Sequence, residues 1–202
     1  MWKYEKKLQC PVDIKKPDPK TARMILTLMG GPDGELGASQ RYLNQRYAMP
    51  YAEVMATLTD IGTEEMAHQE VLSAVIRQLT DGLTATQIEK SDFYPFYLEH
   101  TGGIYPTDTN GVPYTVATFQ SKGDPITDLH EDLAAEQKAR TAYENVLRLV
   151  TDPDVIKPLE FLRQREIAHY QRFGEALRRT TDRLNAKNFY ACNPSFDKNC
   201  GK

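Results

Sequence analysis

The sequence is poor in cysteine and histidine. Its 202 residues include three cysteines and four histidines. The cysteines Cys10, Cys192 and Cys200 lie in the terminal segments, and their spacing matches no zinc motif. An odd number of thiols without a signal peptide indicates synthesis in a reducing compartment. Either these thiols are incidental, or they cross-link the chain in a later, oxidising assembly.

Long apolar runs and a strong excess of one charge are also missing. No run approaches the roughly 18–20 apolar residues that cross a bilayer, so we expect no membrane span. The first twenty residues lack an apolar core, so we expect no secretory signal. The net charge of −3 argues against a nucleic-acid partner bound through its phosphates.

Helical patterns dominate the chain, and there is almost no strand signal. They cover residues 20–29, 35–50, 51–80, 125–150 and 153–184. Prolines predict an extended arm over residues 1–18. Residues 81–124 lack periodicity and predict a long crossover between two helical hairpins, with a short helix or two. The sequence thus predicts an all-α domain over residues 1–184 and a polar C-terminal tail over 185–202.

Two Glu-x-x-His motifs carry the chemistry of the sequence. Glu65 precedes His68 by three residues, and Glu166 precedes His169 by three. This spacing puts both side chains of a pair on one helix face, where they can reach one metal ion.

Each motif interrupts an apolar stripe whose members recur at steps of four and three residues. The stripes consist of Val54, Leu58, Ile61, Leu72, Val75 and Leu79 around the first motif, and of Val155, Leu159, Leu162, Phe173 and Ala176 around the second. Both motifs should therefore face the core. A buried ionised carboxylate is costly unless it is paired or bound to a cation, so two matched interruptions predict a shared cation site.

The motifs belong to a cryptic internal repeat. Glu35 lies 30 residues before Glu65, and Glu136 lies 30 residues before Glu166. An offset of 101 residues superposes these glutamates, the two motif histidines, and Tyr42 on Tyr143. Two hairpins related by a pseudo-two-fold axis would gather four glutamates and two histidines, the donor set of a carboxylate-bridged dinuclear site. Such donors suit manganese or iron, and a redox pair suits peroxide or dioxygen chemistry.

Other polar residues near the motifs leave alternatives open. Tyr42 and Tyr143 are either core aromatics or hydrogen-bond partners of the site. Arg140 either pairs with charges at the ligands or extends its charged end to solvent. We expect the following residues to be solvated or in loops: Glu64, Glu70, Glu131, His100 and His130.

Four runs, in order, resemble the manganese (non-haem) catalases. They are GGPDGELGASQRYLNQRY, LTDIGTEEMAHQEV, KGDPITDLHEDLAAEQKAR and PLEFLRQREIAHYQRFGEAL. With the opening WKYEKKLQCPVDIKKPDP, the likeness is greatest to the short CotJC-type members of bacterial spore coats. It covers roughly residues 1–180. The resemblance implies a ferritin-like four-helix bundle that dismutates hydrogen peroxide to water and dioxygen.

The resemblance also implies roles for single residues. The metal ligands would be Glu35, Glu65, His68, Glu136 and His169, with Glu65 bridging two manganese ions. Glu166 would be drawn back from the metals and would carry protons, whereas a di-iron pattern would make it a sixth ligand. Tyr42 would lie in the outer sphere. The family implies a homo-oligomer, with a hexamer as the common state.

Departures from the family keep other functions open. The chain is shorter than the full-length catalases, and Ala135 replaces an arginine found in some members. By resemblance we expect synthesis in the cytoplasm and a place in the spore coat, with other coat proteins as partners. The alternatives are a mainly structural coat protein with a weak or vestigial metal site, and a di-iron ferroxidase or peroxidase.

Overall fold

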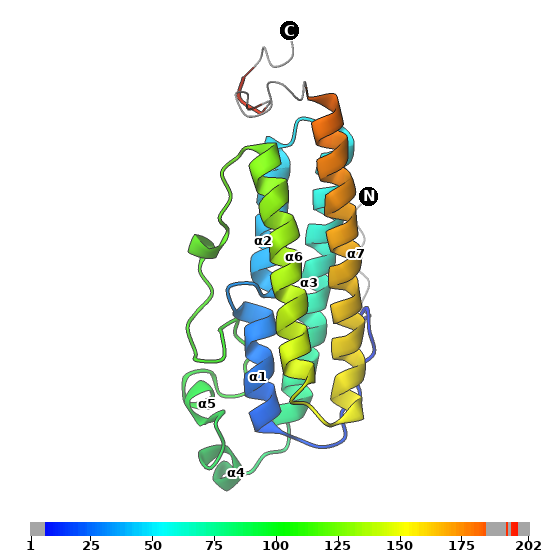
Figure 1. Cartoon of the computed structure of the whole chain (residues 1–202). Helices are drawn as coiled ribbons and strands as arrows, with labels where there is room; N and C mark the ends of the chain where they lie inside the picture. Colours follow the sequence, from blue (N-terminus) through cyan, green and yellow to red (C-terminus); the bar gives the residue numbers. More distant parts are fainter. Residues whose placement is uncertain (1–6, 185–192, 194, 198–202) are drawn as a thin grey trace.

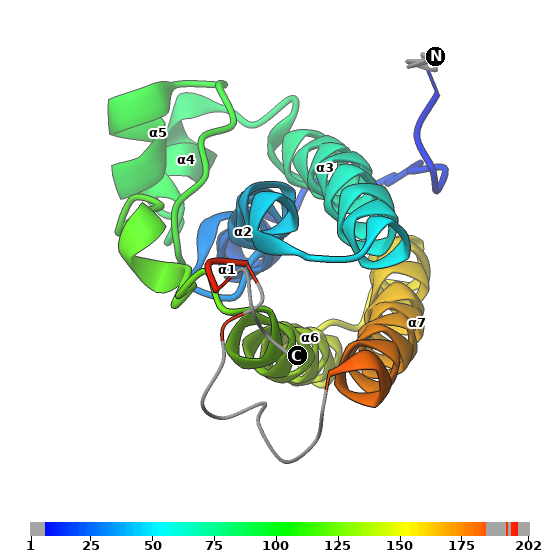
Figure 2. The same ribbon diagram turned by 90° about the horizontal axis from the view of Figure 1, so that it is seen from above.

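A computed structural model describes residues 7–184, 193 and 195–197. This part of the chain contains no β-strand, and one isolated antiparallel β-bridge pairs Thr107 with Pro113. The main helices are α1 (Pro19–Gly30), α2 (Glu35–Gln45), α3 (Ala52–Thr80), α6 (Pro125–Leu147) and α7 (Pro153–Arg183). Helices α1 and α2 lie end to end, and together they form one column beside α3, α6 and α7 (Figure 1). Seen from above, the four columns enclose a common centre (Figure 2).

Local sequence signals explain where these helices begin and end. The side chains of Asp18, Asp124 and Asp152 accept hydrogen bonds from the first turns of α1, α6 and α7. A proline occupies the first position of each of these helices, where its missing N–H costs nothing. Helix α2 is shorter than its sequence pattern predicts, because a 3₁₀ turn at Arg46–Ala48 follows it before Pro50.

Residues 81–124 connect α3 to α6 along the outside of the α1–α2 column (Figures 1 and 2). They contain α4 (Ala85–Glu89), α5 (Tyr94–His100) and the 3₁₀ turn η2 (Val116–Thr118). Buried Arg41 anchors this segment to α2: its Nε donates to the Phe119 carbonyl at 2.9 Å and its Nη2 to the Thr118 carbonyl at 3.0 Å.

The connection also passes close to Gly30 at the end of α1. A Cβ atom at Gly30 would lie 2.3 Å from the backbone of Pro106 and Thr107. We expect Gly30→Ala to lower the midpoint of thermal unfolding by roughly 3–10 °C, since backbone cannot yield as a side chain can. The matched control is Gly174→Ala in α7, whose added Cβ would meet Leu133 at an ordinary 3.9 Å. A Gly30→Ala protein that unfolds at the parent temperature would contradict this packing.

The N-terminal arm runs along α3. The Ile14 N–H donates to Oε1 of Gln78 at 2.7 Å, and Nε2 of Gln78 donates to the Val12 carbonyl at 3.1 Å. The Asp18 N–H donates to the Leu79 carbonyl at 2.8 Å. Cys10 in this arm is a buried free thiol, whereas Cys192, Cys200 and most of the predicted tail lie outside the described residues. Among the helices described, none is long and apolar enough to cross a membrane.

Two apolar clusters fill the bundle at different heights. One cluster includes Leu72, Val75, Leu159 and Leu162, and the other includes Leu58, Ile61, Leu129 and Phe173. Every member of the two predicted stripes around the Glu-x-x-His motifs is buried. The polar side chains of these motifs therefore lie in the core, between the two clusters.

Candidate metal centre

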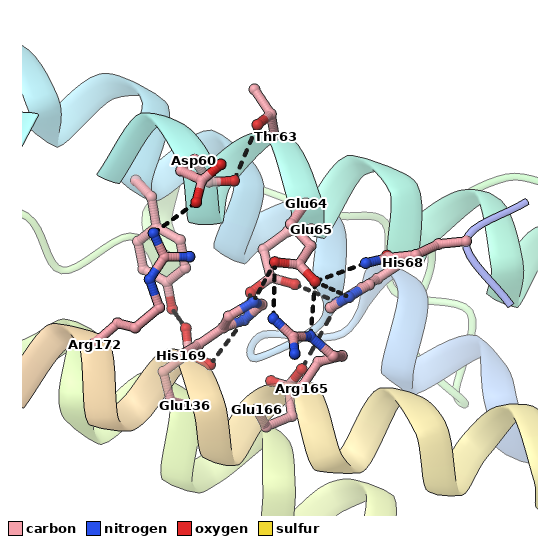
Figure 3. Close-up of polar contacts among 12 residues, drawn as sticks. Asp60, Thr63, Glu64, Glu65, His68, Glu136, Arg165, Glu166, His169 and Arg172 are labelled. Atoms are coloured by element: carbon pink, nitrogen blue, oxygen red, sulfur yellow. Dashed lines mark hydrogen bonds and ion pairs between the residues drawn. The ribbon is translucent and has the colours of Figure 1, made fainter. Parts of the chain in front are cut away.

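Four columns of the bundle each direct at least one acidic side chain to the same point. Glu35 comes from α2, Glu136 from α6, Glu65 and His68 from α3, and Glu166 and His169 from α7. All six residues are at most 2% exposed. In Figure 3 the α3 and α7 side chains face one another, with Glu136 beside them. The structure thus brings together the six residues that the repeat predicts.

Glu65 lies at the middle of this cluster. Its Oε2 is 2.7 Å from Nδ1 of His68, and its Oε1 is 2.7 Å from Nδ1 of His169. The cluster therefore has two halves, each facing one oxygen of the same carboxylate.

A terminal glutamate completes each half of the cluster. Nδ1 of His68 is 3.6 Å from Oε2 of Glu35, and Nδ1 of His169 is 3.7 Å from Oε2 of Glu136. The near-equal distances follow the pseudo-two-fold relation between the hairpins. Glu166 departs from it, because its Oε1 is 3.9 Å from Nδ1 of His68.

Several polar atoms of the cluster are buried without a hydrogen-bond partner. They are both carboxylate oxygens of Glu65, both ring nitrogens of His68, Nδ1 of His169, Oε2 of Glu136, and Oε1 of Glu166. Four side chains, Glu65, His68, Glu166 and His169, each offer a donor atom within 4.8 Å of the others. Buried polar atoms rarely stay unpaired, so these atoms fit bound cations. Carboxylate oxygens with imidazole nitrogens suit manganese or iron.

The electrostatics also require positive charge at this point. Burial, and next the Glu65 carboxylate, raise the pKa of Glu35 to about 8. Burial and the neighbouring Glu35 raise the pKa of Glu166 well above its usual range. Burial opposes the charge of His169, but Glu65 and then Glu136 outweigh it and raise the pKa of His169 to about 12. Protons on carboxylates and imidazoles thus supply, in part, the charge that metal ions would bring.

Two buried tyrosines hold the terminal glutamates. The Tyr42 hydroxyl donates to Oε1 of Glu136 at 2.5 Å, and the Tyr143 hydroxyl donates to Oε1 of Glu35. In both cases Oε2 stays turned toward the histidine of that half. Both tyrosines therefore belong to the surroundings of the site, whereas the resemblance suggested only Tyr42.

One expectation from the sequence is wrong, and one open alternative is decided. Glu64 is not solvated: its side chain is 15% exposed, and its Oε2 lies 3.0 Å from Nε2 of His169. The signal that could have found it is its position four residues before His68, one turn away on the same side of α3. Of the two alternatives for Arg140, the structure excludes pairing with charges at the ligands, because its Nη1 bonds to Glu144 at 2.6 Å.

The remaining polar residues lie away from the cluster. Glu131 pairs with Lys138 at 3.1 Å, His100 stacks on Tyr105, and His130 is exposed. The positions of His100 and His130 agree with the expectation that they lie in the crossover or at the surface, whereas Glu131 is only partly solvated, with a side chain 22% exposed.

Comparison with known proteins gives the same family from sequence and structure. The family model described as manganese containing catalase matches residues 1–189. Protein CotJC of Bacillus subtilis is 46% identical over 177 residues, covering 88% of this chain and 93% of that protein. A probable manganese catalase of Clostridium acetobutylicum is 30% identical over 193 residues, covering 94% and 85%.

A solved structure agrees with these sequence matches. The crystal structure of KatB, a manganese catalase from Anabaena PCC7120, superposes with a TM-score of 0.82 at 30% identity, covering 89% of this chain and 81% of that one. The ferritin-like fold expected from the sequence is thereby confirmed. With this fold and a buried cluster of glutamate and histidine at its centre, the chain belongs to the manganese catalase family.

Proposed function

We propose that this protein dismutates hydrogen peroxide to water and dioxygen at a pair of manganese ions. The observation that carries the proposal is the placement of Glu65, whose two oxygens face two matched halves of a buried donor set. Each half would hold one ion, through His68 and Glu35 on one side and through His169 and Glu136 on the other. Glu65 would bridge the two ions.

The residues of the chain would fix the metals and handle protons. When bound, two manganese ions supply two-electron redox exchange and Lewis acidity. Two molecules of peroxide then yield two of water and one of dioxygen, so protons must move between substrate oxygens. Tyr42 and Tyr143 would hold the terminal carboxylates in their ligating orientation.

Glu166 would be the group that accepts and returns those protons. Its Oε1 is buried and unpartnered, and its pKa lies well above the usual range because of burial and neighbouring carboxylates. A carboxyl group with a raised pKa can act as general acid while protonated and, once it has lost the proton, as general base. If Glu166 were instead a sixth ligand, replacing it would remove metal from the site.

The deciding experiment is metal analysis together with oxygen release. The protein would be purified after growth with manganese and, separately, with iron. Near two manganese per chain with rapid oxygen release from peroxide would support the proposal. Two iron per chain with oxygen consumption on ferrous addition would instead favour a ferroxidase. A folded protein that lacks metal or turnover would favour a mainly structural role.

We further propose that the protein is a homo-oligomer located in the spore coat. The similarity to Protein CotJC and the family resemblance support this placement. Fractionation of spores with an antibody to the protein, and light scattering of the purified protein, would test the two statements. Recovery outside the coat, or a monomer in solution, would overturn the corresponding one.

The affinity for manganese should rise with pH. Glu35 has a pKa of about 8 in the folded, metal-free protein and an ordinary value of 4.5. Its contribution to the stability of the metal-free fold is therefore present below about pH 4.5 and lost as pH rises through about 8. Metal must displace this proton and those on the histidines.

Calorimetric titration with Mn²⁺ would measure this dependence. We expect the affinity to increase between about pH 5 and pH 8, by up to about tenfold per pH unit for each proton released. An affinity that stays constant over this range would contradict ligation by Glu35 and the histidines.

A further inference from the structure

Glu64 and Arg165 occupy equivalent positions of the internal repeat and have opposite charges. They are separated by the same 101 residues that relate His68 to His169. At the ligand positions the two hairpins carry identical residues, but here one has a carboxylate and the other a guanidinium. Identical charged residues at such facing positions would repel each other, whereas this pair attracts.

The two side chains meet directly between α3 and α7. Nε of Arg165 donates to Oε1 of Glu64 at 2.8 Å, and Nη2 donates to Oε2 at 3.3 Å. Figure 3 shows this bidentate ion pair beside the two histidines. Gln9 of the N-terminal arm adds a third donor, with its Nε2 at 2.7 Å from Oε1 of Glu64. The pair therefore ties both hairpins and the arm together at the level of the metal centre.

The same carboxylate faces both imidazole rings. Nε2 of His169 forms a hydrogen bond with Oε2 of Glu64 at 3.0 Å. Nε2 of His68 lies 3.6 Å from Oε1 of Glu64, which is within ion-pair distance but too long for a hydrogen bond. The rings are nearly parallel, at 16°, with centroids 5.5 Å apart. A carboxylate at Nε2 holds the proton there and leaves Nδ1 free for a metal. In both rings Nδ1 points to Glu65.

We propose that Glu64 and Arg165 form a positioning clasp across the pseudo-two-fold axis. The clasp holds α3 against α7, fixes the His169 imidazole with Nδ1 toward the metal pair through a hydrogen bond, and places a carboxylate within ion-pair distance of His68. It concerns the metal centre of the proposed function, but it requires metal binding alone and not turnover. Since the two positions are equivalent in the repeat, a carboxylate placed on α7 instead should bond to His68 and lie near His169.

Charge reversal and exchange test this proposal. The variants are Glu64→Arg, Arg165→Glu and the double variant that carries both changes. We expect each single variant to lose about 10–100-fold in affinity for Mn²⁺. The double variant should recover to within about threefold of the parent, because its carboxylate would reach the histidines from α7. Calorimetry with MnCl₂ alone measures all three affinities.

A matched control separates positioning from general stability. Arg163 and Glu144 form another ion pair between α7 and α6, at 3.0 Å and with similar exposure, but they do not contact either histidine in the structure described. Arg163→Glu should lower the unfolding temperature and leave the Mn²⁺ affinity unchanged. If Arg163→Glu lost as much Mn²⁺ affinity as the Glu64 and Arg165 variants, the Glu64–Arg165 pair would act only through general stability. That result would overturn the proposal.

Thermal unfolding in excess chelator provides a readout that needs no metal. Each single reversal should lower the midpoint by roughly 4–8 °C, and the exchange should restore it. Single variants equal to the parent in affinity and midpoint, or an exchange no better than the single variants, would overturn the clasp. A parent that binds manganese but releases no oxygen would refute the proposed catalysis and leave this test intact.

Discussion

Replacing Glu65 by glutamine is expected to abolish manganese binding and, with it, oxygen release from peroxide. Glu65 is fully buried and lies 2.7 Å from Nδ1 of both His68 and His169. An amide has one acceptor oxygen and no charge, so it cannot bridge two cations as a carboxylate does. Because the substitution removes a shared ligand, the affinity should fall more than the roughly 100-fold that loss of an outer hydrogen-bond partner costs.

Metal analysis and an oxygen electrode would measure both effects on the same sample. The control is Glu131→Gln, which makes the same chemical change on α6 at a residue paired with Lys138. Circular dichroism should show the parental helix content in both variants, so that a loss at Glu65 reflects the site. Parental metal content and oxygen release in Glu65→Gln would refute the proposed ligand set.

The equivalent change in the other hairpin, Glu166→Gln, should have a different result. We expect the metal content to stay near that of the parent while turnover falls by about 10²–10⁴-fold, the usual contribution of a general acid–base group. The two carboxylates are related by the internal repeat, yet Glu65 contacts both imidazoles closely, and Glu166 is 3.9 Å from His68 alone. The same substitution at two equivalent positions would thus separate a ligand from a proton carrier.

Turnover as a function of pH would complete this test. If Glu166 carries the proton, the variant should lose the part of the pH profile that depends on a carboxyl group. Loss of one metal per chain would show instead that Glu166 is a ligand. Parental turnover with parental metal content would exclude both roles.

The apolar stripes explain why much of the centre could be predicted from the sequence. In a helix, residues at alternating steps of four and three share a face, so the burial of Glu65 and His68 follows from Ile61 and Leu72 around them. The cost of burying charge then predicts a cation, whatever the wider fold. The repeat added Glu35 and Glu136, because two similar hairpins pack in similar ways.

The residues around the ligands could not be placed from the sequence, because their positions depend on contacts between distant parts of the chain. Glu64 lies outside its apolar stripe, and its burial results from Gln9, 55 residues away, and from Arg165, 101 residues away. Arg140 follows Glu136 by one turn on α6 but bonds to Glu144 beside it, and Glu144 also pairs with Arg163 of the next helix. No local pattern specifies such partners.

The sequence by itself therefore determined the fold class and the set of buried glutamates and histidines, because periodicity and the energy of buried charge are local properties. Only the tertiary structure decided which oxygen faces which nitrogen, which tyrosine holds which glutamate, and that Glu64 pairs with Arg165 and bonds to His169. These contacts join separate helices and the arm, and their geometry is set by how the whole bundle packs.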